Sequence, residues 1–247
     1  MELYLITGFL GAGKTTFLKN FARQFAGRRL RLIINEFGRA GVDGTLLREL
    51  DAALDEISNG SIFCACRLDQ FEAALEQAAA DAPDVVLVEA SGLADPTNVR
   101  RVLAQFPAVS YQGSVCVADA ARLEKVFSTA RACPRQLAVS SLVLLNKTDL
   151  ATEAQCAEAK ALILRANPAA RIRRTQFGRF EPEWLSLIVP DVDVDEVLDM
   201  PDITLQKAVL QIRPTMPFTA LQKCLVQLAG ETWRIKGFVR VPEGIFY

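Results

Sequence analysis

The amino-acid sequence predicts an α/β protein, with a mostly parallel central sheet flanked by helices and a small α+β domain at the C-terminus. Short apolar runs, such as Val85–Val88 and Leu142–Leu145, alternate along the chain with segments of helical periodicity. Strands that alternate with helices indicate a parallel sheet with right-handed crossovers. Continuous apolar runs are typical of strands that are buried on both faces. The length of 247 residues suffices for one such domain and a small appendage.

The predicted strands and helices follow one another through the first 189 residues. The strands are residues 2–7, 30–35, 84–89, 114–118, 141–146 and 171–175, and the helices are residues 13–25, 68–80, 96–105 and 152–167. Thr152, with Gln155 three residues later, forms a capping-box pattern that begins the last of these helices. Pro168 ends that helix, because the residue before a proline avoids the helical conformation.

The composition changes after residue 189. Residues 190–203 are acidic and bounded by prolines, which we interpret as a linker. Beyond them we expect a strand at 204–213, a helix at 219–228 and a second strand at 234–241. The sequence therefore predicts a domain of residues 1–189, an acidic linker of residues 190–203 and a small α+β domain of residues 204–247.

Composition excludes several classes of function. The 28 basic and 29 acidic side chains give a net charge of -1, which argues against a protein that coats nucleic acid or an anionic membrane. The chain has no histidine, and this excludes Ser-His-Asp and Cys-His catalysis and any metal held by histidine. No apolar run approaches the roughly 20 residues of a membrane-spanning helix, and the N-terminus lacks the basic region and cleavage site of a signal peptide. We expect a cytoplasmic protein whose six cysteines are reduced thiols.

Residues 8–16 read GFLGAGKTT and match the pattern GxxxxGK[ST] between a predicted strand and a predicted helix. This is the context of a P-loop, in which backbone N–H groups surround phosphate oxygens at a helix N-terminus. Lys14 would contact the β- and γ-phosphates, and the Thr15 hydroxyl would bind Mg²⁺. The predicted nucleotide-binding residues here are Gly8, Gly11, Ala12, Gly13, Lys14, Thr15 and Thr16. The expected fold is accordingly that of the P-loop NTPases.

The residues Asn146, Lys147 and Asp149 form the pattern NKxD at the end of a predicted strand. A carboxylate at Asp149 can accept hydrogen bonds from N1–H and the exocyclic amine of guanine, whereas adenine offers no such pair of donors. Asn146 and the stem of Lys147 would brace this loop and the base. The pattern favours GTP over ATP as the bound nucleotide.

Glu89 ends another predicted strand, and Gly92 follows three residues later. In a P-loop protein, an acidic residue at this position holds Mg²⁺ or its water, and a glycine N–H can sense the γ-phosphate. We therefore include Glu89 and Gly92 in the predicted site.

Together these motifs resemble the CobW-like GTPases, which are relatives of the urease and hydrogenase maturation GTPases. The segment NEFG at 35–38, with GVD at 41–43, resembles the family's first switch segment. EASGLADP at 89–96 resembles the second switch, and RIKGF at 234–238 resembles a strand of the C-terminal domain. The resemblance implies GTP hydrolysis that is coupled to delivery of a metal or metallocofactor, commonly zinc or cobalamin-related cobalt, to a client protein.

The resemblance also implies roles for individual residues. Asp43 and Glu89 would organise Mg²⁺ and the attacking water, so the predicted catalytic residues are Lys14, Asp43 and Glu89, and the predicted Mg²⁺ ligands are Thr15, Asp43 and Glu89. Glu36 is either part of this site or a surface carboxylate. The family's C-terminal domain continues with further strands and a helix. The short domain here is therefore either truncated or covered at its exposed edge by another chain, such as a second copy.

The sequence departs from the family at its metal-binding motif. The family carries CxCC after Asn-Gly, but here Asn59-Gly60 is followed by SIFCAC, which leaves only Cys64 and adds Cys66. Arg39 stands where the family often has an acidic residue, and acidic residues replace a histidine-rich stretch before the C-terminal domain. A closed zinc site needs four ligands. Cys64 and Cys66 are therefore ordinary thiols, a Zn²⁺ or Co²⁺ site completed by a client's ligands, or a redox-sensitive pair.

The leading hypothesis is a GTP/GDP switch that uses Mg²⁺, hydrolyses GTP and assists the assembly or activation of a metalloenzyme or a corrinoid protein, without storing the metal itself. One alternative is a GTP-dependent adaptor with little hydrolysis. Another is a zinc or cobalt metallochaperone that uses Cys64 and Cys66. A metabolic P-loop kinase is disfavoured, because it has no need of the NKxD loop.

Overall fold

The computed structural model describes residues 1–36, 52–58, 62, 68–190, 216–231 and 239–246. The chain divides into two compact units, Met1–Ile203 and Thr204–Tyr247. The predicted linker lies, apart from Pro190, outside the described residues.

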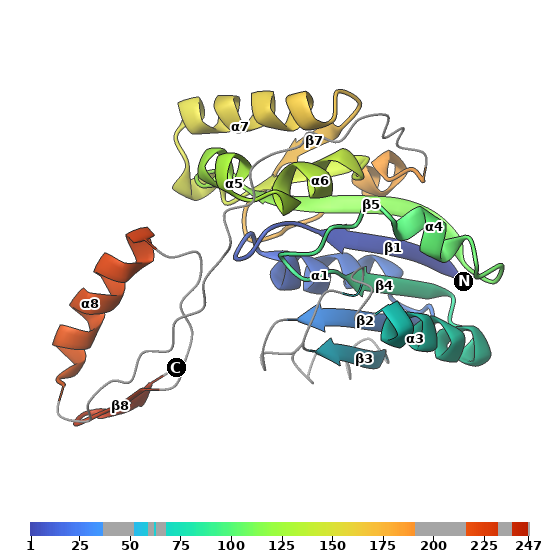
Figure 1. Cartoon of the computed structure of the whole chain (residues 1–247), viewed down its shortest axis with the longest axis horizontal. Helices are drawn as coiled ribbons and strands as arrows, with labels where there is room; N and C mark the ends of the chain where they lie inside the picture. The colour runs from blue at the N-terminus through green and yellow to red at the C-terminus, as the bar shows by residue number, and fades with distance from the viewer. Residues whose placement is uncertain (37–51, 59–61, 63–67, 191–215, 232–238, 247) are drawn as a thin grey trace. The chain divides into compact units, whose positions relative to one another are not determined.

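The first unit is built on a seven-stranded sheet in the order β3-β2-β4-β1-β5-β6-β7, in which every neighbouring pair is parallel (Figure 1). Its strands are β1 (Glu2–Thr7), β2 (Leu30–Glu36), β3 (Ala53–Ser58), β4 (Val85–Glu89), β5 (Ser110–Asp119), β6 (Leu142–Asn146) and β7 (Arg171–Arg174). Its α-helices are α1 (Lys14–Ala22), α3 (Leu68–Asp81), α4 (Val99–Leu103), α5 (Leu123–Thr129), α6 (Ala132–Ala138) and α7 (Glu153–Ala166). The predicted α/β class with a parallel sheet is confirmed.

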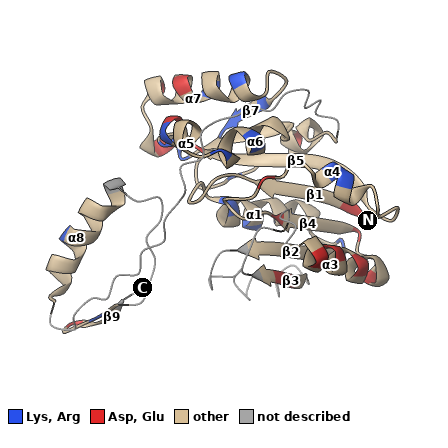
Figure 2. Cartoon of the chain, viewed as in Figure 1, with Lys and Arg blue, Asp and Glu red and all other residues tan. Residues whose placement is uncertain are grey.

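Both faces of the sheet are buried, which explains the continuous apolar runs. Tyr4 and Ile6 of β1 belong to one hydrophobic cluster, and Leu3 and Leu5 of the same strand belong to the other. This division follows from the two-residue period of a strand. Charged side chains lie mainly on the helices, while the central strands carry few of them (Figure 2).

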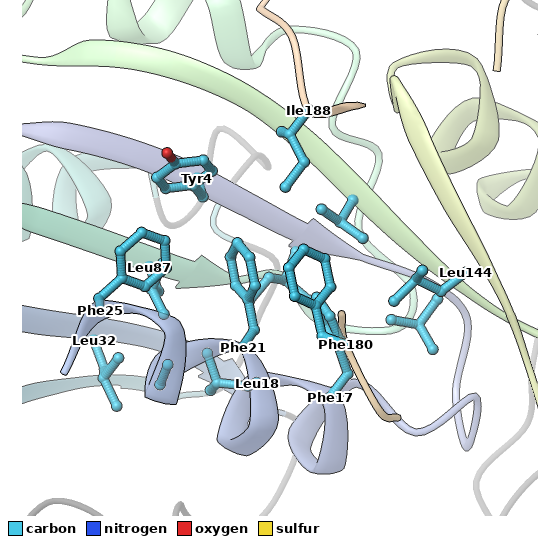
Figure 3. Close-up of a cluster of buried hydrophobic side chains, with 14 of the residues drawn as sticks. Tyr4, Phe17, Leu18, Phe21, Phe25, Leu32, Leu87, Leu144, Phe180 and Ile188 are labelled. Carbon is cyan, nitrogen blue, oxygen red and sulfur yellow. The ribbon is translucent and has the colours of Figure 1, made fainter. Parts of the chain in front are cut away.

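An aromatic cluster covers one face of the sheet, where α1 packs against the strands (Figure 3). Phe21 lies at its centre and makes edge contacts with Phe180 and Tyr4, with ring centroids 4.8 and 5.6 Å apart. Phe17 stacks on Phe21 at 5.2 Å, and Phe25 meets it edge-on at the same distance. The cluster anchors α1, and with it the loop that precedes this helix.

Several elements differ from the prediction. The strand β3 and the helices α5 and α6 were not expected from the sequence. The edge strand β3 carries Asp55, which pairs with Arg31 of β2 at 2.6 Å, so its pattern lacks an apolar run. The strand β5 begins four residues before the predicted start, and Gly113, with a φ of 132°, lies within the added part. The helix predicted at 96–105 is confined to α4.

The predicted capping box at the start of α7 is confirmed. The backbone N–H of Gln155 donates to Thr152 Oγ1 at 3.2 Å, and the N–H of Thr152 donates to Gln155 Oε1 at 2.9 Å. Two donors of the first turn, which would otherwise lack partners, are satisfied by this exchange.

The second unit contains the helix α8 (Phe218–Glu231) and an antiparallel hairpin of β8 (Val239–Val241) and β9 (Gly244–Phe246). The strand β9 was not expected, because its three residues are too few to show an alternating pattern. The strand predicted at 204–213 lies outside the described residues. Coverage of an edge of this unit by another chain stays a prediction.

Among the described residues, no helix is both long enough and apolar enough to span a membrane.

Removal of the central aromatic ring tests this core. We expect Phe21→Ala to lower the free energy of unfolding by about 3–5 kcal/mol, because the side chain is fully buried and leaves a cavity. Denaturant unfolding followed by circular dichroism measures this change. The matched control is Phe177→Ala, since the Phe177 side chain is 63% exposed and its loss should change the stability by no more than about 0.5 kcal/mol. Equal losses of unfolding free energy in the two variants would contradict the central place of Phe21 in the core.

Candidate functional site

The loop of residues 8–13 joins the end of β1 to the start of α1. Its glycines Gly8, Gly11 and Gly13 have φ values of 133°, 75° and 104°, which side-chain-bearing residues rarely adopt. A Cβ at Gly13 would lie 2.6 Å from Asn146 Nδ2. Gly13 therefore permits both the left-handed turn and the close approach of Asn146. The helix begins immediately afterwards, with a bond of 2.9 Å from Phe17 N to Gly13 O.

Lys14 and Thr15 occupy the first turn of α1, where unpaired N–H groups attract anions. The Lys14 side chain is 8% exposed, and its Nζ donates to Phe9 O of the preceding loop at 3.2 Å. The ammonium group thus lies beside the loop that would surround a phosphate. Ala12 is buried and Thr16 is exposed. The phosphate contacts of these residues stay predictions.

Glu89 lies at the carboxyl end of β4 and meets Thr15. Thr15 Oγ1 donates to Glu89 Oε1 at 3.1 Å, although the two residues are 74 positions apart. The Glu89 side chain is buried, with 5% exposure. Mg²⁺ prefers oxygen ligands and binds through few carboxylates, so this hydroxyl–carboxylate pair has the chemistry that the ion requires. The structure brings together two of the three predicted Mg²⁺ ligands; the third, Asp43, lies outside the described residues.

The segment after Glu89 contacts the phosphate loop. A Cβ at Gly92 would lie 2.7 Å from the backbone N of Leu10, so the two loops approach as closely as a glycine allows. Gln136 of α6 holds this segment from the other side, because its Nε2 donates to Gly92 O at 3.2 Å and to Ala94 O at 2.9 Å. The segment is therefore positioned between the phosphate loop and α6.

Asp95 stabilises the C-terminal end of this segment. It accepts hydrogen bonds from Thr97 and forms an ion pair with Arg135 of α6. Burial raises the pKa of the Asp95 carboxyl, but the hydrogen bonds from Thr97 and Arg135 outweigh burial and leave the pKa below its ordinary value. Asp95 thus remains ionised at neutral pH.

The predicted guanine loop follows β6 and is bound to the phosphate loop. Asn146 Nδ2 donates to Ala12 O at 2.9 Å, and Lys147 Nζ donates to Gly11 O at 2.7 Å. Lys147 also pairs with Asp119 Oδ2 at 2.7 Å. Asp149 lies in the 3₁₀ turn Thr148–Leu150 and is exposed. The NKxD loop is therefore bound to the phosphate loop through Asn146 and Lys147 and carries an exposed carboxylate at Asp149. It lies at the carboxyl edge of the sheet, where open α/β sheets bind ligands.

Three residues of this arrangement were missed by the sequence analysis. Asp119 ends β5 and is in register with Asn146 at the end of β6, so its position at a strand terminus was an available signal. Gly178 donates its N–H to Asn146 Oδ1 at 3.0 Å, and Gln136 supports Gly92 from a helix. Phe177-Gly178 resembles the end of the family's GTPase domain, but the contacts of Gly178 and Gln136 are not evident from the sequence, because both act through partners that are distant in it.

The cysteines of the predicted metal site, Cys64 and Cys66, lie outside the described residues. Within the described part of the chain, no three His, Cys, Asp or Glu side chains are grouped to hold a metal ion. Cys116 and Cys133 are buried. Burial raises the pKa of the Cys116 thiol to about 12 and that of Cys133 well above its ordinary value. Neither thiol is therefore suited to bind metal as a thiolate.

A family model described as the CobW/HypB/UreG nucleotide-binding domain matches residues 2–174. The chain belongs to this family. The matched range includes the phosphate loop, Glu89 and the NKxD loop.

Two relatives of this chain are named zinc chaperones. The chain is 32% identical over 206 residues to the zinc chaperone CobW of Pseudomonas aeruginosa, which covers 69% of this chain and 55% of the relative. It is 26% identical over 226 residues to the zinc chaperone YjiA of Escherichia coli, which covers 87% of this chain and 66% of the relative. The chain thus spans between about half and two thirds of the length of these two relatives.

Solved structures agree on the fold. The Zn(II)-bound YjiA GTPase from E. coli superposes with a TM-score of 0.57 at 22% identity, over 90% of this chain and 69% of that one. The hydrogenase maturation factor HypB from Archaeoglobus fulgidus superposes with a TM-score of 0.50 at 21% identity, over 75% of this chain and 87% of that one. At these identities the likeness supports the P-loop GTPase fold, which the sequence predicted.

Substitution at Gly13 tests the contact between the two loops. We expect Gly13→Ala to weaken nucleotide binding about tenfold or more, because the new Cβ would displace Asn146 from the phosphate loop. Calorimetric titration with GDP measures the affinity. The matched control is Gly27→Ala, which has a φ of 84° but no atom within 4 Å of its Cβ, so it shares the backbone strain and lacks the clash. If both variants bind GDP equally well, the contact is unimportant for binding.

Proposed function

We propose that this protein is a Mg²⁺-dependent GTPase, and that it acts as a switch in the delivery of a metal or metallocofactor to a client metalloenzyme or corrinoid protein. The observation that carries this proposal is the joining of the NKxD loop to the phosphate loop through Asn146 and Lys147. One ligand could contact both loops at the same edge of the sheet. A guanine nucleotide has the phosphate and the base that these loops would bind.

Guanine selection depends on Asp149. Its exposed carboxylate can accept from N1–H and from the exocyclic amine of guanine, whereas adenine has no N1–H. The stem of Lys147 is held along the phosphate loop by its bonds to Gly11 O and Asp119, and it can cover one face of the base. These contacts favour GTP over ATP.

Phosphoryl transfer to water requires charge neutralisation and a positioned water molecule. Lys14 would neutralise charge at the β- and γ-phosphates, and backbone N–H groups of residues 11–16 would bind the phosphate oxygens. Mg²⁺, when bound through Thr15, Glu89 and Asp43, would neutralise the charge that develops on the phosphate oxygens. Gly92 packs against the phosphate loop, and its N–H would report the presence of a γ-phosphate.

The role in metal handling is supported by two relatives that are named zinc chaperones. The described cysteines Cys116, Cys133, Cys156 and Cys224 are free thiols, which supports our proposal that the protein works in the reducing cytoplasm.

A weak hydrolysis rate that a client stimulates would distinguish the switch from an adaptor that binds GTP without turnover.

Lys14 provides the test of GTP hydrolysis. We expect the protein to hydrolyse GTP with Mg²⁺ and to bind GDP more tightly than ADP, and we expect Lys14→Ala to lower single-turnover hydrolysis by about 100-fold or more. Lys19→Ala, one turn later in α1, is the control and should retain the rate. Equal affinity for ADP and GDP, or an unchanged rate in Lys14→Ala, would contradict the proposal.

A second candidate, a zinc metallochaperone that uses Cys64 and Cys66, is favoured by the same relatives. The chain supplies only two thiolates where a closed zinc site needs four ligands, and it has no histidine. We therefore expect calorimetric titration of Zn²⁺ into the protein with a GTP analogue to show no saturable binding. Saturable binding that is lost in Cys64→Ser, but kept in the control Cys224→Ser, would instead establish the chaperone.

A further inference from the structure

Asn35 is a buried polar residue for which the proposed mechanism has no role. It lies near the end of β2, which runs between β3 and β4, and its side chain is 2% exposed. In the sheet register Asn35 is paired with Ile57 of β3, and its neighbour Ile34 is paired with Glu89 of β4. Asn35 therefore lies where the segments that follow β3 and β4 leave the sheet.

The Asn35 carboxamide contacts both of these segments. Its Oδ1 accepts from the backbone N of Ile62 at 3.0 Å and from the backbone N of Ser91 at 3.3 Å, while its Nδ2 donates to Ile57 O at 3.1 Å. A carbonyl oxygen has two lone pairs. One oxygen atom thus connects two backbone N–H groups from different parts of the chain.

The Ser91 end of this connection adjoins the candidate site. Ser91 lies between Glu89, which accepts from Thr15, and Gly92, which packs against Leu10 of the phosphate loop. Ser91 Oγ is buried and has no hydrogen-bond partner among the residues that the structure describes. A buried hydroxyl needs a partner, which a bound ligand, an ordered water or a second arrangement of this segment would supply.

The Ile62 end adjoins the cysteine-bearing stretch. Ile62 is fully buried in the hydrophobic cluster that contains Phe71 and Leu75 of α3. Cys64 follows two residues later in the sequence. A change in the bond at Ile62 N therefore acts at the start of the stretch that carries both Cys64 and Cys66.

We propose that Asn35 is a positioning residue. It couples the nucleotide-dependent conformation of the segment around Ser91 to the conformation of the backbone at Ile62. This inference rests on the proposed function, because it needs a bound guanine nucleotide. When a γ-phosphate contacts the Gly92 N–H and shifts the Glu89–Gly92 segment, the Ser91 N–H moves relative to Asn35 Oδ1. A buried N–H cannot lose its acceptor without cost, so the carboxamide follows Ser91 and its bond to Ile62 changes.

The test measures amide hydrogen exchange at Ile62 and Ser91 in the full chain, with Mg²⁺ and either GDP or a nonhydrolysable GTP analogue. In the wild type we expect both amides to exchange at rates that differ between the two nucleotides, by about 5- to 150-fold. In Asn35→Ala, Ser91 should still respond to the nucleotide while Ile62 no longer does. The matched control is Asn167→Ala: Asn167 is also buried and donates to the backbone carbonyls of Leu137, Ala138 and Ser140, which belong to neither segment. This control should keep both responses.

Several outcomes overturn the coupling. One is a wild-type Ile62 amide that exchanges equally with the two nucleotides, when calorimetry shows that both nucleotides bind. Another is an Asn35→Ala variant with a full Ile62 response. If Asn35→Ala does not fold, Asn35→Asp decides, because it keeps the acceptor oxygen and loses the donor to Ile57 O; the coupling requires that its Ile62 response persists. Absence of nucleotide binding would overturn the proposed function itself, and the coupling with it.

Discussion

The Asn146 carboxamide joins three loops of the first unit. Its Nδ2 donates to Ala12 O of the phosphate loop, and its Oδ1 accepts from Gly178 N of the loop that follows β7. The side chain is 2% exposed, so both bonds lie in a medium of low dielectric, where they are strong and where leaving either group unpaired would be costly. Gly13 makes this arrangement feasible, because any Cβ at that position would occupy the space of the Asn146 amide.

The parallel sheet explains why these loops meet at all. Every strand of the first unit ends at the same edge, so the loops after β1, β4 and β6 begin close together. The strand β1 lies between β4 and β5, which places the phosphate loop next to Glu89 on one side and next to the end of β5 on the other. Burial of both faces makes this frame rigid, and the aromatic cluster around Phe21 ties α1 to it.

The predicted nucleotide site and the cysteine stretch around Cys64 and Cys66 differ in how many of the family's motif residues they retain. The phosphate loop, Thr15, Glu89 and the NKxD loop form one connected set of contacts. The cysteine stretch has two thiols where the family has a fuller motif, and the buried thiols Cys116 and Cys133 cannot supplement it at neutral pH. Our proposal of a switch that acts on a client, rather than a carrier that stores metal, follows from this difference. Through its bonds to Ser91 and Ile62, Asn35 connects the predicted nucleotide site to the start of the cysteine stretch.

The sequence predicted the central strands and long helices well and the short or marginal elements poorly. Strands such as β4 and β6 were predictable, because a strand buried on both faces needs an unbroken apolar run. The edge strand β3 was not, because its Asp55 is stabilised by Arg31, a partner that no local pattern reveals. The seven-residue helices α5 and α6 are too short to show a clear helical period.

The same distinction holds for the candidate site. The residue types at the phosphate loop, at Glu89 and at the NKxD loop are recognisable locally, because the proposed function requires each motif to place its own atoms around one ligand within a few residues. The contacts that Asp119, Gln136, Gly178 and Asn35 make with these motifs depend on strand order and register, which local patterns do not determine. These contacts join residues that are 22 to 56 positions apart in the sequence. These bonds form only when the sheet has brought the strand ends to one edge, and so they became visible only in the folded chain.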